Sequence, residues 1–354
     1  MAEKILMKGN EALAEAAIRA GCRCFFGYPI TPQTQVAEYM AKKLPKIGGV
    51  YMQSESEVSA INMVMGAAAT GARAMTSSSS PGISLKAEGI SYIAGCDLPA
   101  VIVNMQRGGP GLGGIQPAQS DYYQATKGLA HGDFHLIVLA PSGVQEIVDL
   151  MGKAFDLADN YRMPVMILGD GMLGQMMEPI TLPEPKEEDR SSKTWATCGT
   201  KGERKRNVVN SLYIQPDELE RLVRERYDRY AQIERDEVMC EEYLTEDADI
   251  VIAAYGAAAR IAKNAIAAAR AEGIKVGLLR PITLWPFPKA AFAKTAEKVK
   301  AFLTVEMSMG QMVDDVKLAI DCKRPVHFFG RTGGVVPTPA EILAELKKIH
   351  GGDR

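Results

Sequence analysis

Three side chains able to do chemistry together lie near the ends of apolar segments in the first third of the sequence. The first is Glu57, which follows Glu55 and precedes a segment rich in small residues. Ile61 and Val64 share its helical face, so a helix here would turn Glu57 toward the protein interior and Glu55 toward solvent. The helix dipole stabilises a carboxylate in the first turn. Taken alone, Glu57 is more simply interpreted as a helix-start acid without catalytic function.

The other two are a hydroxyl and a guanidinium. Thr31 lies in the segment Tyr28-Pro29-Ile30-Thr31-Pro32, just after an apolar strand. We expect Thr31 to cap a helix with Pro32 as its first residue. Helix starts beyond parallel strands are also common binding places for anionic groups. Arg107 ends another apolar strand before a glycine-rich loop over 108–117, and it offers a bidentate site for a carboxylate. An exposed loop arginine is the alternative.

Two further motifs follow strands. The segment Ser77-Ser78-Ser79-Ser80-Pro81-Gly82 could hydrogen-bond a ligand or could simply start a helix, and the two interpretations carry equal weight. Gly169-Asp170-Gly171 resembles the start of a thiamine-diphosphate metal signature, in which an asparagine completes the site. The first asparagine after Asp170 is Asn207, beyond a polar segment. We therefore interpret this motif as a turn at a strand end and predict no metal site in this chain.

Alternating helices and apolar strands must position these residues. Strands that are apolar throughout and separated by helices indicate a parallel sheet with both faces covered. The sequence predicts strands over 22–27, 50–53, 73–77, 99–105, 136–140 and 164–168, and helices over 11–20, 31–43, 56–72, 81–94 and 144–161. Residues 181–245 break the rhythm with a polar segment and one amphipathic helix over 216–238. A second α/β unit starts at Asp247.

Composition limits the possible functions. The 354 residues carry 41 basic and 43 acidic side chains, and this balance does not suggest a nucleic-acid or membrane partner. The start of the chain does not look like a signal peptide, so we expect a cytoplasmic protein. The six cysteines show no spacing for an iron–sulfur cluster or zinc. Any metal clusters used in its reaction are expected elsewhere.

Four segments together resemble a known family. They are Tyr28 to Pro32, Glu55 to Asn62, Thr76 to Gly82 and Arg107 to Gly111, in this order. The combination resembles the α subunit of 2-oxoacid:ferredoxin oxidoreductases, with most likeness to the branched-chain (2-oxoisovalerate) type. The resemblance covers essentially the whole chain, and the combined motifs are specific although each alone is not.

The resemblance implies a fold and a set of site residues. It implies a thiamine-diphosphate pyrimidine-binding domain over 1–182, a connecting segment over 183–246 and a transketolase C-terminal-like domain over 247–354. Glu57 matches the carboxylate that hydrogen-bonds the aminopyrimidine ring of the cofactor. Thr31 and Arg107 match substrate-binding positions. The implied cofactor-binding residues are Tyr28, Pro29, Ile30, Glu57, Ser78 and Ser79.

The resemblance also implies partners. A β subunit would carry Mg²⁺ and the diphosphate half of the site, while small ferredoxin-like and γ-type subunits would complete the enzyme and its iron–sulfur clusters. Ferredoxin would accept the electrons, and coenzyme A would be the co-substrate. The expected reaction is oxidative decarboxylation of a branched-chain 2-oxoacid to an acyl-CoA. The same chemistry on 2-oxoglutarate and a non-catalytic scaffold subunit are the alternatives.

Overall fold

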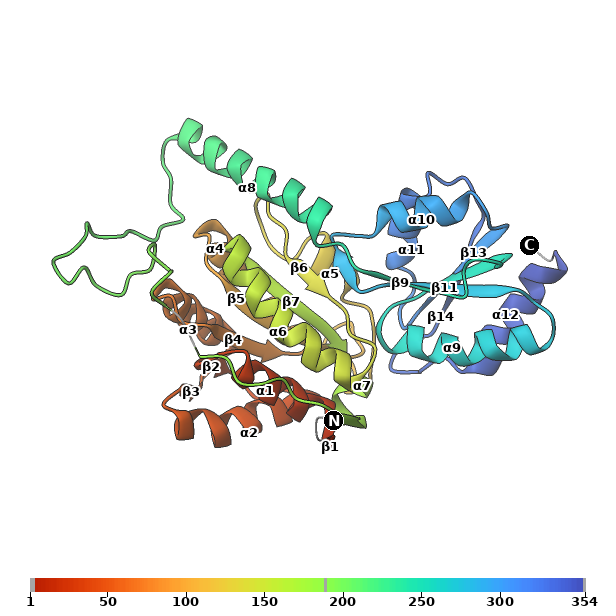
Figure 1. Cartoon of the computed structure of the whole chain (residues 1–354), viewed down its shortest axis with the longest axis horizontal. Coiled ribbons are helices and arrows are strands. Elements are labelled where there is room, and N and C mark those ends of the chain that lie inside the picture. The colour runs from red at the N-terminus through yellow and green to blue at the C-terminus, as the bar shows by residue number, and fades with distance from the viewer. Residues whose placement is uncertain (1–3, 188–189, 353–354) are drawn as a thin grey trace.

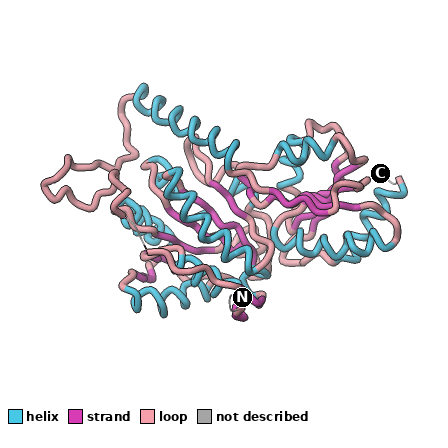
Figure 2. The backbone as a smooth tube through the Cα atoms, viewed as in Figure 1, coloured by secondary structure: helices cyan, strands magenta, loops and turns pink. Residues whose placement is uncertain are grey.

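The structure is a computed structural model that describes residues 4–187 and 190–352. It has the expected mixed α/β architecture, with two predominantly parallel sheets that lie side by side (Figure 1). We call them the large sheet and the small sheet. Figure 2 shows their strands as two separate groups, each lined by helices.

The large sheet is built mainly from the first half of the chain. Its strands are β2 (Cys24–Gly27), β3 (Val50–Gln53), β4 (Ala74–Ser78), β5 (Ala100–Gln106), β6 (Ile137–Leu139), β7 (Pro164–Asp170) and β12 (Thr283–Trp285). They lie in the order β12-β6-β7-β5-β4-β2-β3, and all neighbours are parallel except β12 and β6. The central strands β4, β5 and β7 are buried along their whole length. The composition of β5 and β7 is mostly apolar, as expected for such strands, whereas β4 ends in Thr76, Ser77 and Ser78.

Helices cover both faces of this sheet. The helices of this half are α1 (Gly9–Arg19), α2 (Thr34–Lys43), η1 (Leu44–Ile47), α3 (Glu57–Ala69), α4 (Ser80–Gly95), α5 (Tyr122–Thr126), α6 (Val144–Tyr161) and α7 (Gly171–Gln175). The helix α1 packs between α2 and α6 on one face, while α3 and α4 pack together on the other. A small antiparallel ribbon, β1 (Ile5–Lys8) with β8 (Met177–Ile180), lies beside them.

The carboxyl ends of the strands meet at one edge of the large sheet. Strand register pairs Ser78 at the end of β4 with Asn104 in β5, and Gln106 at the end of β5 with Asp170 at the end of β7. Each of the segments singled out from the sequence therefore leaves the sheet at this edge. The sheet thus brings together residues that are far apart in the chain.

The middle of the chain runs along the outside of the large sheet. A long loop projects from the molecule and leads into α8 (Pro216–Asp236), which runs along one side (Figure 1). The amphipathic helix predicted here is confirmed. Tyr230 from its buried face contacts His135 and Trp285, with ring centroids 5.4 Å from each.

The small sheet is formed by the last part of the chain. Its strands are β9 (Cys240–Tyr243), β10 (Ile250–Ala253), β11 (Val276–Pro281), β13 (Ala301–Glu306) and β14 (Val326–Gly330), in the order β14-β13-β10-β11-β9 with β9 antiparallel. Its helices are α9 (Gly256–Ala271), α10 (Lys289–Ala296), α11 (Met312–Ala319) and α12 (Pro339–Gly351). Alanine-rich α9 packs against β11, β13 and α12, where its small side chains allow close approach.

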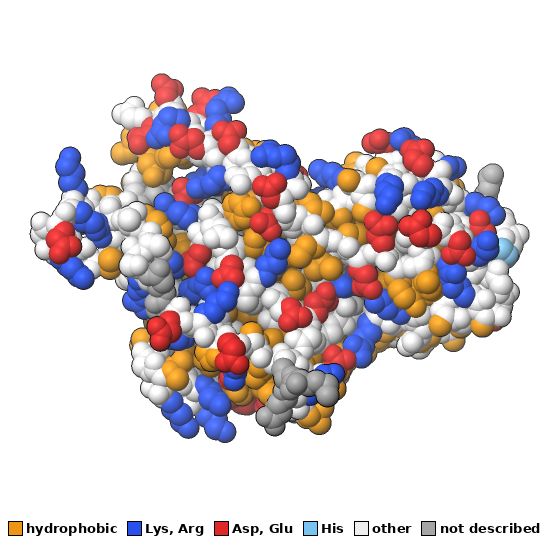
Figure 3. All heavy atoms as spheres, in the orientation of Figure 1, with side chains coloured by type: hydrophobic (Ala, Val, Ile, Leu, Met, Phe, Trp, Pro, Cys, Tyr) orange, Lys and Arg blue, Asp and Glu red, His pale blue; other side chains and the backbone are white. Residues whose placement is uncertain are grey.

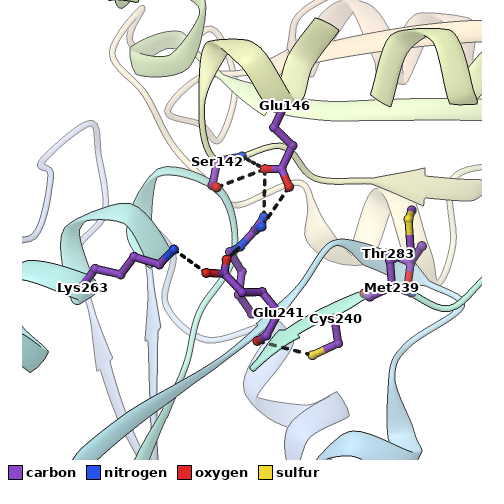
Figure 4. A network of polar contacts seen from close by, with 8 residues as sticks. Ser142, Glu146, Met239, Cys240, Glu241, Lys263 and Thr283 are labelled. Carbon is purple, nitrogen blue, oxygen red and sulfur yellow. Dashed lines mark hydrogen bonds and ion pairs between the residues drawn. The ribbon is translucent and has the colours of Figure 1, made fainter. Parts of the chain in front are cut away.

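The two units are joined by a shared sheet as well as by contacts between their surfaces. The strand β12 belongs by sequence to the second unit but pairs with β6 in the large sheet. Arg280, the residue before Pro281 at the end of β11, donates to Glu146 of α6 at 2.8 and 2.9 Å and to Glu241 of β9 at 2.6 Å. Glu146 also accepts from Ser142, and Glu241 from Lys263 (Figure 4). The expected boundary at residue 246 remains a proposal, and both sheets contain a strand from across it.

Candidate active site

Glu57 is the first residue of α3 and lies inside the protein. The side chain of Ser56 accepts a hydrogen bond from the Ser59 amide at 3.2 Å and so caps the helix. Glu57 is 5% exposed, whereas Glu55 is exposed to solvent. The predicted orientations of both acids are confirmed. A buried carboxylate is costly unless it has partners, so its surroundings are informative.

Two glycines on α4 provide the space beside α3. An added Cβ at Gly82 would lie 2.6 Å from Glu57 Oε1 and 2.1 Å from Ser78 Oγ. An added Cβ at Gly89, two turns along, would lie 2.4 Å from Ile61 Cγ2. The close approach of the two helices therefore requires glycine at both positions, and Glu57 fills the space that Gly82 leaves open.

Several buried polar atoms on β4, at the start of α4 and at the start of α2 have no partner among the described residues. Among the described residues, none hydrogen-bonds the Oγ atoms of Ser78 and Ser79, Oγ1 of Thr76 or Nε2 of Gln33. The other amide atom of Gln33, Oε1, accepts from Ser77 Oγ at 2.5 Å. Each unpaired buried group costs about 1–3 kcal/mol, so such a cluster at one sheet edge indicates a place where a polar ligand binds. The donors and acceptors fit a hydrogen-bonding heterocycle such as an aminopyrimidine.

The prediction that Thr31 caps a helix is wrong. The helix α2 begins at Thr34, and its N-cap residue is Gln33. The amide of Gln33 donates to the carbonyl of Ile30 at 3.2 Å, which makes a turn of this segment, and the buried Gln33 side chain is held by Ser77. Because of these contacts α2 starts at Thr34, and Thr31 lies exposed in the loop beyond β2. The neighbouring Tyr28 is 38% exposed.

Arg107 lies next to Thr31. Its guanidinium donates through Nη1 to the Thr31 carbonyl at 3.0 Å and through Nη2 to the Leu112 carbonyl at 3.3 Å. The side chain is 9% exposed, so it is not a free loop arginine. Its Nε has no partner among the residues that the structure describes. Arg107 thus ties the glycine-rich loop to the loop of Thr31, and it retains donor capacity for a ligand.

A buried polar network fixes the backbone at Arg107. Ser80 Oγ accepts from the Arg107 amide at 3.1 Å and bonds Asp121 Oδ2 at 2.6 Å. Asn104 donates to the same carboxylate oxygen at 2.9 Å and accepts from the Ser80 amide at 3.1 Å. Burial raises the pKa of Asp121, and these hydrogen bonds oppose that shift. The network connects β5, α4 and the loop before α5 directly behind Arg107.

Sequence reasoning missed Lys86. This lysine of α4 is completely buried, and its Nζ donates to the Ser77 carbonyl at 3.1 Å. Burial lowers the pKa of Lys86 to about 7, and the charge of nearby Glu57 partly offsets that effect. A signal was present in the sequence, because Ile83, Lys86 and Ile90 share one helical face that is otherwise apolar.

Asp170 caps a short helix at the end of β7. It ends β7, and its Oδ1 accepts from the amides of Met172 and Leu173 at 2.9 and 3.1 Å, so it caps α7. Burial raises the pKa of Asp170 to about 6. Among the described residues there is no group of three or more His, Cys, Asp or Glu side chains arranged to hold a metal.

Surface and helix composition add little to the site. Acidic and basic side chains are interspersed over the face drawn in Figure 3. Over residues 4–187 and 190–352, no helix is both long and apolar enough to span a membrane.

Comparison with protein families matches both parts of the chain. Residues 15–245 match the pyruvate flavodoxin/ferredoxin oxidoreductase, thiamine diphosphate-binding family. Residues 248–342 match core domain II of pyruvate:ferredoxin oxidoreductase.

Individual relatives cover nearly the full chain. A ketoisovalerate oxidoreductase subunit VorB of Methanothermobacter marburgensis is 51% identical, with 98% of each chain covered. A 2-oxoglutarate synthase subunit KorA of Methanothermobacter thermautotrophicus is 39% identical, covering 99% of this chain and all of the relative.

A solved structure shares the fold of the whole chain. It is the 2-oxoglutarate:ferredoxin oxidoreductase from Magnetococcus marinus with 2-oxoglutarate, coenzyme A and succinyl-CoA bound, and it superposes with a TM-score of 0.87 at 28% identity. It covers 98% of this chain, which spans 65% of the length of that longer chain. A split-gene transketolase, at 15% identity and a TM-score of 0.60, shows the likeness of fold alone.

Proposed function

Because this chain belongs to the 2-oxoacid:ferredoxin oxidoreductase family, we propose that it is the α-type subunit of an enzyme that oxidatively decarboxylates a branched-chain 2-oxoacid. The 2-oxoacid and coenzyme A would give an acyl-CoA, CO₂ and a proton, and two electrons would pass to ferredoxin. The observation that supports this most directly is buried Glu57 among unpaired polar atoms. We expect the enzyme to work in the cytoplasm.

The residues around Glu57 fit the pyrimidine end of thiamine diphosphate. When bound, this cofactor supplies the nucleophile and the electron sink for decarboxylation. Glu57 would accept a hydrogen bond from the heterocycle and hold the proton relay at that end of the site. Ser78, Ser79 and Gln33 would supply hydrogen bonds for their unpaired atoms, and Tyr28, Pro29 and Ile30 would line the entrance. The backbone at Gly82 keeps the space beside Glu57 open.

The substrate carboxylate would bind between Thr31 and Arg107. The Thr31 hydroxyl is exposed, and the Arg107 guanidinium lies 3.0 Å from the Thr31 carbonyl, so a carboxylate at this point can meet both. A charge-assisted hydrogen bond from Arg107 would orient the 2-oxoacid and stabilise its negative charge. The buried network at Asp121 would keep the guanidinium in place.

Partner subunits would supply what this chain does not carry. A β subunit would bring Mg²⁺ and bind the diphosphate, and small ferredoxin-like and γ-type subunits would bring iron–sulfur clusters and complete the assembly. The exposed loop over 108–117 beside the site would face the β subunit. Leu112, 86% exposed in that loop, suits such a contact.

Substitution of Glu57 tests the proposal. In the reconstituted enzyme, Glu57→Gln should lower 2-oxoacid-dependent ferredoxin reduction by roughly 10²- to 10⁴-fold, because the amide cannot take part in proton transfer. Glu55→Gln is the matched control, since that side chain faces solvent, and it should leave the rate unchanged. Full activity of Glu57→Gln would refute the catalytic role and favour a scaffold subunit.

A scaffold function explains the site less well. A chain that only bound partners would gain nothing from keeping a buried acid and several unpaired polar atoms together at a sheet edge. The reaction on 2-oxoglutarate is the stronger alternative, since relatives of that name are 39% identical.

A substrate comparison decides between the two 2-oxoacids. We expect kcat/KM to be highest for 2-oxoisovalerate and lower for 2-oxoglutarate and pyruvate. The VorB-type relatives have the higher identity, and Arg107 offers one guanidinium for one carboxylate. The three acids should be compared at equal ferredoxin and coenzyme A. A preference for 2-oxoglutarate would contradict the branched-chain assignment and leave the reaction type intact.

A further inference from the structure

Lys86 is buried more completely than its contacts explain. Its side chain is 0% exposed, and its ammonium donates to the Ser77 carbonyl at 3.1 Å. An ammonium has three N–H donors, and no second hydrogen bond from it is made within the described residues. Placing a cation in the interior with one neutral partner is unfavourable unless a negative charge lies near.

The geometry of α4 turns Lys86 toward Glu57. Gly82 lies one turn before Lys86 on the same face of α4, and the backbone of Gly82 borders Glu57 Oε1 and Ser78 Oγ. Side chains in a helix lean toward its N-terminus, so Lys86 extends toward Gly82. Its bond to Ser77 confirms this direction.

Two unpaired hydroxyls lie in the same region. Thr76 and Ser78 are two residues apart on β4, so both point to the face of the large sheet that α3 and α4 cover. Neither Oγ1 of Thr76 nor Oγ of Ser78 has a partner among the described residues. Neither hydroxyl therefore bonds the Lys86 ammonium, whose charge needs another partner.

Glu57 is the charge that Lys86 faces. Of the elements packed against α4, strand β5 has no charged residue, and Asp170 at the end of β7 is held by the amides that start α7. On α3 the charged residue is Glu57. On α4 itself, Glu88 is exposed and bonded to Tyr92. Burial lowers the pKa of Lys86 to about 7, and Glu57 acts in the opposite direction.

We propose that Lys86 is a positioning residue, the buried counter-ion that holds the Glu57 carboxylate in place at the start of α3. The inference rests on the proposed function, because it assumes that Glu57 serves the cofactor. Lys86 itself touches neither substrate nor cofactor in this scheme. Its effect on the reaction passes through Glu57.

The titration of Lys86 tests the pairing without any cofactor. The full chain labelled with ¹³C-lysine can be followed by NMR against pH, with Lys86→Met to assign the resonance. In Glu57→Gln the pKa of Lys86 should fall by roughly one unit, because the neighbouring negative charge is gone. Glu55→Gln should leave it unchanged. An equal pKa of Lys86 in the wild type and Glu57→Gln, or an ordinary lysine pKa in the wild type, would overturn the proposal.

Activity of Lys86→Met in the reconstituted enzyme is the second test. We expect kcat to fall roughly 10- to 100-fold with little change in the KM for the 2-oxoacid, since a displaced acid impairs the reaction more than substrate binding. The denaturation midpoint should also fall, because removal of the cation leaves the buried Glu57 carboxylate without its counter-ion. Lys46→Met, at an exposed lysine, should behave as wild type.

The activities of Lys86→Met and Glu57→Gln in the reconstituted enzyme distinguish a failure of the role of Lys86 from a failure of the proposed function. Full activity of Lys86→Met together with an inactive Glu57→Gln would reject the role of Lys86 and leave the proposed function standing. Full activity of both variants would reject both.

Discussion

At the scale of single residues, the carboxylate of Glu57 lies where a side chain at position 82 would be. An alanine there would place its Cβ 2.6 Å from Glu57 Oε1 and 2.1 Å from Ser78 Oγ, distances that force one of them to move. The identity of residue 82 therefore controls the position of the acid, although glycine has no functional group of its own.

We predict that Gly82→Ala impairs catalysis more than stability. In the reconstituted enzyme, ferredoxin reduction should fall by roughly 10-fold or more, because a shift of about 1 Å in a reacting group can cost up to 100-fold. The measurement is the rate with saturating 2-oxoacid, together with the denaturation midpoint of the isolated chain. An unchanged rate would show that Glu57 has another position available.

Gly66→Ala is the control for the glycine change itself. An added Cβ at Gly66, also in a helix, meets nothing within 4 Å. Replacing an unstrained helical glycine by alanine stabilises by about 0.5–1 kcal/mol. Gly66→Ala should therefore raise the denaturation midpoint of the isolated chain.

At the scale of elements, the helices and strands that could be predicted from the sequence are those whose burial determines their composition. The predicted helix over 144–161 agrees with α6 residue for residue, and the predicted strand over 164–168 lies within the fully buried β7. Buried parallel strands are apolar throughout, and surface helices show an apolar stripe, so both leave a clear pattern. The burial of Glu57 followed from the same periodicity.

Elements that depend on distant partners were not predicted. The strands β1, β8, β9 and β12 are short, and each is defined by a pairing with a segment far away in the chain. The predicted start of α2 was wrong for a similar reason, because the Gln33 side chain accepts a hydrogen bond from Ser77 of the distant strand β4. Lys86 was missed although Ile83, Lys86 and Ile90 share one face of α4, because that pattern indicates burial but not which charge the lysine meets. The neighbouring charge depends on the packing of α4 against α3.

At the scale of the whole molecule, Arg280 connects the two units. It is 5% exposed and bonds Glu146 of α6, which packs on the large sheet, and Glu241 of β9 in the small sheet. Its positive charge between the two carboxylates also offsets the electrostatic repulsion between them.

We predict that Arg280→Met lowers the free energy of unfolding by about 2–4 kcal/mol, because it leaves both partly buried carboxylates without their shared cation. Arg221→Met is the control, since Arg221 forms an exposed pair with Glu225 within α8. Exposed pairs of this kind contribute about 0.5 kcal/mol or less. Urea denaturation of the two variants measures the difference. Equal effects would show that Arg280 contributes no more than a surface charge.

The position of β12 in the sequence determines when the large sheet can be completed during synthesis of the chain. It covers the edge of β6, yet it lies at Thr283–Trp285, long after the other strands of that sheet. A ribosome produces the chain from its N-terminus, so the nascent large sheet carries an open edge until these three residues emerge. Open edges are sites of unwanted strand pairing. Once made, β12 replaces β6 as the end strand, and an edge of only three residues offers few groups for pairing with another chain.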